Sequence, residues 1–202
     1  MIKNKKIKPS IERLIEFQSF LLKFQAIDRV LHVKKDDEQK HENDVEHSYS
    51  LAMMGWFLAD YFPELDKDKV IRFALVHDLV EVYAGDTYIF ADKEYLQSKK
   101  KREHEALKKI QAEWPDFLDM HNTIQDYEEM VSDEAKFVYS LDKILPVMLN
   151  LLNDGYTWKT EGITLDQLHE QKKSKATFSK DIAPYYEALY QLMTENKHLF
   201  GK

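Results

Sequence analysis

Apolar residues recur at the spacing of an α-helix along most of this chain. They predict a first helix within residues 11–24 and a second helix over about residues 45–61. The segment between them, 34–40, is almost entirely charged or polar, and we expect it to form a loop. The chain therefore begins with two helices joined through a polar connection.

The same spacing continues to the C-terminal end of the chain. Asp66 is a good N-cap for a third helix that we expect to reach about residue 84, where Gly85 would end it. No segment shows the alternation typical of a strand, so the pattern predicts an all-α, bundle-like fold. The further helices are expected at residues 93–113, at 132–152 with Gly155 closing the helix, at about 165–175 and at about 182–196.

The composition is that of one globular domain. The chain has 202 residues, and 44% of them are hydrophobic, which is enough for one sizeable core. Only five glycines and five prolines are present, and this favours long helices over a turn-rich β architecture. We therefore expect residues 1–202 to form a single domain.

Charge and residue types exclude several classes of function. The net charge of -7 argues against broad binding to nucleic acid, and no apolar run approaches the roughly 18 residues of a membrane span. The absence of cysteine excludes disulfides and thiolate chemistry and fits a cytoplasmic protein. An anionic small substrate is still compatible with the charge, because a metal and a few cations can reverse the field inside a cleft.

The dipeptide His77-Asp78 stands inside the largely apolar run 70–81. A buried ionised group is costly unless it is paired, neutralised or bound to a metal. A divalent cation would satisfy both side chains at once, since imidazole and carboxylate are ordinary metal ligands. The dipeptide therefore indicates a metal site that needs further ligands from elsewhere in the chain.

Two other polar residues are candidates for these ligands. His47 lies where the second helix begins, a position that disfavours its protonated form and leaves a nitrogen available. Asp142 is the single carboxylate of the largely apolar stretch 138–145, and Pro146 is expected to loosen or kink the helix at that carboxylate. Taken alone, each is more often structural, but together with His77-Asp78 they form a specific pattern.

Geometry adds two carboxylates to the candidate site. Glu81 follows His77 by one helical turn and lies on the same face. Asp86 follows Gly85, where the helix should end, and could reach back over that face. Carboxylates beside a metal can position an attacking water or protonate a leaving group, although a solvated helix end is an equally good interpretation of each.

With these residues the chain resembles the HD-domain phosphohydrolases, an all-α superfamily named for the dipeptide. The resemblance covers about residues 10–155 and implies an HD-domain helical bundle on which C-terminal helices 156–202 would pack. Three stretches are similar to the 5′-deoxynucleotidase-like branch, namely Glu42-Asn43-x-x-Glu46-His47-Ser48, His77-Asp78-x-x-Glu81-x-x-x-Gly85-Asp86-Thr87 and Glu134-Ala135-Lys136-x-x-x-x-x-Asp142-Lys143.

The resemblance implies a hydrolase of nucleoside or deoxynucleoside 5′-monophosphates that uses one divalent metal ion, which could be Mn, Co, Mg, Zn or Fe. Glu81 and Asp86 would act in the hydrolytic step, and Arg29 would bind substrate phosphate. We expect Lys143 either to bind phosphate as well or to pair with Asp142 or lie outside the site. Relatives are often dimers, so a homodimer is compatible with the resemblance. The implied metal ligands are His47, His77, Asp78 and Asp142.

Two features depart from this branch, and both concern the substrate end of the site. Relatives usually carry an aromatic residue after the phosphate-binding arginine, whereas Val30 follows Arg29 here. The segment 34–40 is a charged insertion between Arg29 and His47. The metal ligands match the branch better than the substrate-binding segment does.

Three alternatives stay open. Alarmone hydrolases of the superfamily typically carry a Glu-Asp pair after the dipeptide, whereas this chain has Glu81-Val82. Cyclic-nucleotide phosphodiesterases generally use further histidines for a second metal. A non-catalytic nucleotide-binding protein could fill a structural metal shell with four protein ligands, whereas catalysis needs an open position; Glu81 and Asp86 would then have no role.

Overall fold

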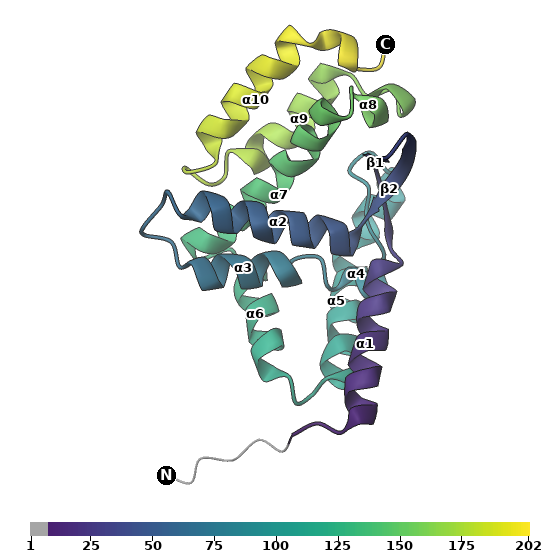
Figure 1. Cartoon of the computed structure of the whole chain (residues 1–202), viewed down its shortest axis with the longest axis vertical. Coiled ribbons are helices and arrows are strands. Elements are labelled where there is room, and N and C mark those ends of the chain that lie inside the picture. Colours follow the sequence, from purple (N-terminus) through teal and green to yellow (C-terminus); the bar gives the residue numbers. More distant parts are fainter. Residues whose placement is uncertain (1–7) are drawn as a thin grey trace.

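Helices make up most of the structure, a computed structural model that describes residues 8–202 (Figure 1). The predicted all-α fold is confirmed, with one small two-stranded sheet added to it. The helices are α1 (Ile11–Gln25), α2 (Asp44–Ala59), α3 (Lys67–Val76), α4 (Glu81–Ala84), α5 (Lys93–Glu113), α6 (Leu118–Glu128), α7 (Asp133–Leu152), α8 (Tyr156–Thr160), α9 (Leu165–Ala176), α10 (Ala183–Glu195) and the short 3₁₀ helix η1 (Lys197–Leu199).

A β-hairpin occupies the region where the sequence predicted a loop and no strand. Strand β1 (Asp28–Lys35) pairs antiparallel with β2 (Glu38–Asn43), and the predicted loop 34–40 forms the tip of this hairpin. Leu31 is the one buried apolar side chain of the two strands. The hairpin therefore lacks the alternating apolar pattern by which a strand is recognised in a sequence.

The predicted third helix is divided at the His-Asp dipeptide. It consists of α3 and the short α4, and it ends at Gly85, with a φ of 74°, as predicted. Between the two helices, the backbone N–H groups of Leu79 and Glu81 bond to carbonyl oxygens three residues earlier. The chain therefore turns more tightly than an α-helix there. Hydrophobic spacing could not reveal this change, because the apolar residues continue through it.

Two α-helices and the short 3₁₀ helix η1 were not predicted from the sequence. Helix α6 starts after Phe117, which makes no side-chain capping bond, so the sequence has no start signal there. Helix α8 is only five residues long and follows Gly155, whose φ is 67°. Helix α7 runs through Pro146 as one element, so no break separates Asp142 from the rest of that helix.

Two clusters of buried apolar side chains connect the helices. The larger cluster joins α2, α3 and α7 to the C-terminal helices and includes Leu51, Phe73 and Phe137. The smaller one joins α1, α5 and α6 around Phe20 and Ile110. Helices α2, α3 and α7 contact one another pairwise, and Figure 1 shows α2 and α3 side by side across the middle of the molecule. This packing brings the three candidate ligand segments together.

The C-terminal helices α9 and α10 pack against α7. The division into a core of about residues 10–155 and C-terminal helices within a single domain stays a prediction. Within residues 8–202, no helix has both the length and the apolar character needed to cross a bilayer.

Candidate metal centre and adjoining pocket

Three segments far apart in the sequence bring the predicted metal ligands together. His47 Nε2 lies 3.0 Å from Asp142 Oδ1, and His77 Nε2 lies 3.9 Å from the same oxygen. The two imidazole ring centroids are 5.3 Å apart. Asp78 completes the group, with its Oδ2 atom 2.9 Å from His77 Nε2. All four predicted ligands therefore face one small volume between α2, α7 and the turn after α3.

The hydrogen bonding of His77 leaves one of its nitrogens aimed at this volume. Its Nδ1 atom lies 2.9 Å from the carbonyl oxygen of Ala74, which can only accept a hydrogen bond. Nδ1 therefore carries the proton, and the lone pair of a neutral ring lies on Nε2. No hydrogen-bond partner for Nε2 exists among residues 8–202, although the Asp78 carboxylate lies beside it. Two electron-rich atoms in this arrangement fit a bound cation.

His47 is placed by the first turn of α2. Asn43 caps this helix, since its side chain accepts the backbone N–H of Glu46 at 3.0 Å, and the Glu46 carboxylate accepts the N–H of Asn43 at 3.3 Å. Burial and Arg29 act to lower the pKa of His47, but the carboxylates of Asp142 and Glu42 outweigh them and raise it. The capping box therefore fixes the backbone that aims His47 into a group of carboxylates.

Arg29, the predicted phosphate-binding residue, forms ion pairs with three carboxylates. Its guanidinium donates to Asp44 at 3.1 Å and to Asp78 at 3.0 Å, and its Nε atom lies 3.5 Å from Glu42. Burial acts to raise the pKa of Asp78, but His77 and Arg29 together hold it well below its usual range. Arg29 therefore neutralises part of the negative charge of an acidic cluster formed by Glu42, Asp44 and Asp78.

Lys143, the second predicted phosphate-binding residue, pairs with the neighbouring Asp142. Its ammonium group donates to Asp142 Oδ2, which leaves Oδ1 directed at the two histidines. Burial acts to raise the pKa of Asp142, but Lys143 and His47 hold it well below its usual value. Whether either cation also binds phosphate stays a prediction.

The two predicted catalytic carboxylates lie beside the ligands. Glu81 is 3% exposed, and ligand atoms of Asp44, Asp78 and Glu81 lie within 4.8 Å of one another. Burial and the negative charges of Asp78 and Asp44 raise the pKa of Glu81 well above its usual value. Burial also raises the pKa of Asp86. Both groups therefore hold a proton more tightly than an exposed carboxylate does.

The loop that carries Asp86 is anchored by α5. The Arg102 guanidinium donates to the carbonyl oxygen of Ala84 at 2.6 Å and to the Thr87 hydroxyl at 2.8 Å. Gly85, between these two contacts, takes a positive φ that only glycine adopts at little cost. The glycine and the arginine together determine where Asp86 lies.

The donor set fits a divalent ion. Within residues 8–202, several buried nitrogen and oxygen atoms that face this volume make no hydrogen bond, and mixed imidazole and carboxylate donors suit transition metals. Ligand atoms of His47, His77 and Asp78 lie within 4.8 Å of one another, and Asp142 Oδ1 faces both histidines. In the described part of the chain, buried atoms without a hydrogen bond at this site include His77 Nε2, Asp44 Oδ2 and Glu81 Oε2, whereas His47 Nδ1 and Glu42 Oε2 lie 3.4 Å from each other.

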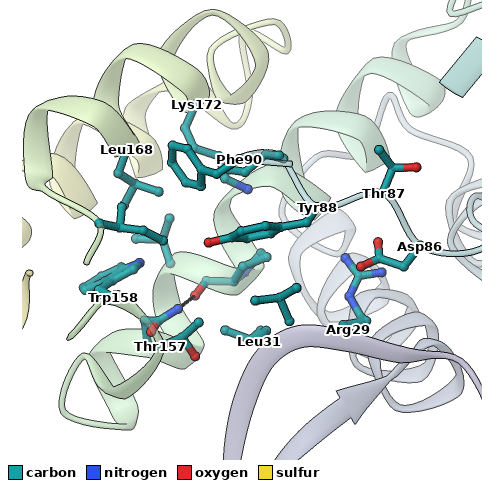
Figure 2. Close-up of a pocket in the computed structure, with 16 residues that line it drawn as sticks. Arg29, Leu31, Asp86, Thr87, Tyr88, Phe90, Thr157, Trp158, Leu168 and Lys172 are labelled. Carbon is teal, nitrogen blue, oxygen red and sulfur yellow. Dashed lines mark hydrogen bonds between the residues drawn. The ribbon is translucent and has the colours of Figure 1, made fainter. Parts of the chain in front are cut away.

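A cavity adjoins the metal centre. It opens to solvent and has an internal volume of about 100 Å³. Figure 2 shows Arg29 and Asp86 at one end and Trp158, Leu168 and Lys172 at the other. Aromatic and aliphatic side chains form most of its wall. The cavity therefore leads from a charged end to a largely apolar end.

Sequence reasoning missed Asp44, Glu42 and Lys172. Asp44 lies one helical turn before His47 in the same polar stretch, so its spacing could have shown that both residues share a face. Glu42 is 2% exposed, but it stands on a strand that was not predicted. Lys172 looks like any other lysine on a polar helix, and no local signal distinguishes it.

Comparison with known proteins identifies the family. A family model described as an HD domain matches residues 23–182, well over half of the chain. The chain belongs to the HD domain family. The matched part of this HD domain extends through α9, beyond the region of the predicted resemblance.

Curated relatives of this HD domain include the mouse and human proteins named 5′-deoxynucleotidase HDDC2. They are 38% and 37% identical to it over 107 residues, which are 52% of this chain and 52% and 51% of the two relatives. The chain thus spans about half the length of the curated relatives it matches. The predicted likeness to the 5′-deoxynucleotidase-like branch is confirmed.

A solved structure is similar over almost the whole HD domain. It is the crystal structure of a predicted metal-dependent phosphohydrolase from Magnetospirillum magnetotacticum, with a TM-score of 0.77 and 29% identity. The similarity covers 97% of this chain and 100% of the other. Together with the buried donor set, this family membership implies a divalent metal ion as the cofactor.

Proposed function

We propose that this HD domain hydrolyses the phosphomonoester of deoxynucleoside 5′-monophosphates with a divalent metal ion. The observation that carries the proposal is the meeting of His47, His77-Asp78 and Asp142 beside the charged end of a cavity. The names of the mouse and human relatives support this substrate class.

His47, His77, Asp78 and Asp142 would hold the metal ion. Bound there, the ion would supply charge neutralisation for the phosphoryl group and would lower the pKa of a bound water. Lys143 would keep the Asp142 carboxylate oriented through its ion pair. Arg29 would limit the repulsion among the surrounding carboxylates and offer its remaining N–H groups to a phosphate oxygen.

The carboxylates around the ligands would move the protons. A water oxygen attacks phosphorus, the bond from phosphorus to the 5′-oxygen breaks, and that oxygen takes up a proton as the nucleoside leaves. Glu81, whose carboxylate borders Asp78 and Asp44, would hold the attacking water and take its proton. Asp86, on the loop that lines the cavity, would give a proton to the leaving oxygen. The products are inorganic phosphate and a nucleoside.

Phosphate release from a panel of ribo- and deoxynucleoside 5′-monophosphates tests the proposal. The purified protein should be assayed with Mn²⁺, Co²⁺, Mg²⁺, Zn²⁺ and Fe²⁺ in turn, and with a chelator as the metal-free control. We expect release from at least one deoxynucleotide with at least one metal, and none with the chelator. A protein that binds nucleotides with every metal but never releases phosphate would be a binding protein, and the proposal would be wrong.

Two further expectations accompany the proposed function. Because relatives are often dimers, we propose a homodimer, and sedimentation velocity tests it. We also propose a cytoplasmic location without a nucleic-acid or membrane partner, which cell fractionation and pull-down experiments test.

A further inference from the structure

A buried lysine without a counter-ion lies in the apolar part of the cavity. Lys172 of α9 is 6% exposed and lines the cavity. None of the described residues forms a hydrogen bond or ion pair with its amino group. Burial and the positive charges of Lys143, Arg29 and Lys175 lower the pKa of Lys172, and Asp142, which acts to raise it, is already paired with Lys143 and His47. Because an unpaired buried cation is costly, this arrangement points to an acceptor that comes from a ligand.

The surroundings of Lys172 favour a flat, partly polar group as that ligand. Tyr88, Phe90 and Trp158 line the same part of the cavity (Figure 2), and aromatic side chains stack well on nucleobases. Arg29 and Asp86 lie at the other end, next to the metal centre. A nucleotide whose phosphate occupies the metal centre would therefore place its base near Lys172.

Two other polar atoms of the cavity wall have no partner within the described chain. Asn150 donates from its amide nitrogen to the carbonyl oxygen of Pro146 at 3.1 Å, and its Oδ1 atom makes no hydrogen bond. The Tyr88 hydroxyl, also buried, makes none either. The wall thus offers a donor at Lys172, an acceptor at Asn150 and a hydroxyl that can do both.

This combination matches one kind of base edge. Guanine and thymine carry a carbonyl oxygen beside a ring N–H, whereas adenine and cytosine carry an amino group at the corresponding carbon. A lysine ammonium donates to such an oxygen, and an amide oxygen accepts from such a ring N–H. An amino group facing Lys172 would leave the cation without an acceptor.

We propose that Lys172 donates a hydrogen bond to the carbonyl oxygen of a keto base, so that the cavity prefers guanine and thymine over adenine and cytosine. The inference rests on the proposed function, because it places the nucleotide with its phosphate at the metal centre. It makes Lys172 a specificity-determining residue, supplied by a helix that carries none of the metal ligands.

Binding of the free nucleosides to the metal-loaded protein tests the inference, since nucleosides lack the phosphate and cannot be hydrolysed. Isothermal titration calorimetry should compare deoxyguanosine and thymidine with deoxyadenosine and deoxycytidine. A hydrogen bond to a charged group contributes about 1.5–3 kcal/mol, so we expect the keto nucleosides to bind at least about tenfold more tightly. Lys172→Met should abolish this preference, and Lys172→Arg, which keeps a cationic donor, should retain part of it.

Lys173→Met is the matched control, because Lys173 neighbours Lys172 on α9 and is exposed. It should keep the wild-type preference. Equal binding of all four nucleosides by the wild type, or an unchanged preference in folded Lys172→Met, would overturn the inference. Equal weakening of all four nucleosides in that variant would assign Lys172 a packing role and overturn it as well. Failure of the proposed function is seen separately, as the absence of phosphate release from every nucleotide by the wild type.

Discussion

The two ends of the cavity differ in how they are built. At the metal end, charged and imidazole groups from β1, α2, α7 and the turn after α3 crowd together and neutralise one another in pairs. At the other end, apolar and aromatic walls surround one lysine and a few polar atoms that have no partner within residues 8–202. The first end is suited to chemistry on a charged group, and the second to selection of a neutral one.

The difference shows how one pocket can keep reaction and recognition apart. Removing a charge from the metal end leaves other buried charges unbalanced, so function and stability should fall together. Removing the charge of Lys172 relieves an unfavourable burial, so recognition should fall while stability rises. Opposite effects of mutation on stability therefore distinguish the two ends.

The largest expected effect is on catalysis at the metal end. His77→Ala removes an implied ligand, and we expect phosphate release to fall at least about 10³-fold, since charge stabilisation by a metal contributes several kcal/mol to the transition state. Steady-state kinetics with the preferred nucleotide measures the loss. His198→Ala, on an exposed histidine, should leave the rate unchanged. Full activity in His77→Ala would contradict the metal mechanism.

Arg29→Met should lower stability as well as activity. The substitution leaves Glu42, Asp44 and Asp78 without their shared cation, and loss of a buried ion partner costs about 3–5 kcal/mol. Chemical denaturation measures the free energy of unfolding. Arg72→Met, at an ion pair whose side chains are half exposed, should cost less than about 1 kcal/mol. An Arg29 variant with wild-type stability would show that this residue serves the substrate alone.

Lys172→Met should raise stability near neutral pH. Burial lowers the pKa of Lys172 to about 7, so between pH 7 and its unfolded value near 10.5 the unfolded chain binds more protons than the folded one. Wild-type stability should therefore rise with pH across that window. The gain of the variant over wild type should be largest at pH 7 and below, about 4–5 kcal/mol, and should vanish above pH 10.5.

Denaturation of both proteins at several pH values measures this difference. Lys173→Met, the exposed neighbour, should follow the wild-type curve throughout. A constant offset between Lys172→Met and wild type at every pH would mean that packing, and not the buried charge, distinguishes the two proteins.

Metal binding should stabilise the metal end by a smaller amount that depends on concentration. At a metal concentration of 100 times Kd, the free energy of unfolding should rise by about 2.7 kcal/mol, and a chelator should reverse the rise. Thermal unfolding with and without Mn²⁺ or Co²⁺ checks this. The same metals should have little effect on His77→Ala. Equal stabilisation of that variant would place the bound metal at a different site.

Much of the metal end was predictable because its residues contrast with their local sequence. His77-Asp78 and Asp142 are polar residues in apolar runs, and Glu81 lies near Asp78 although the chain between them turns more tightly than the helix from which its position was predicted. The start of α2 could be recognised from polar residues ahead of an apolar run, and the stop at Gly85 from a glycine after one. These signals are local, since each depends on residues within a few positions of one another.

What the sequence determined by itself was therefore the helical class of the fold, most of the helices and four residues that lie together at the candidate metal centre. Only the tertiary structure decided that Arg29 pairs with carboxylates, that residues 28–43 form a hairpin and that Asp44 and Glu42 join the acidic cluster. It alone buries Lys172 in the cavity. The reason is physical. Helix periodicity and capping depend on residues that are close in the sequence, whereas the burial and pairing of a charge depend on segments that meet only when the chain folds.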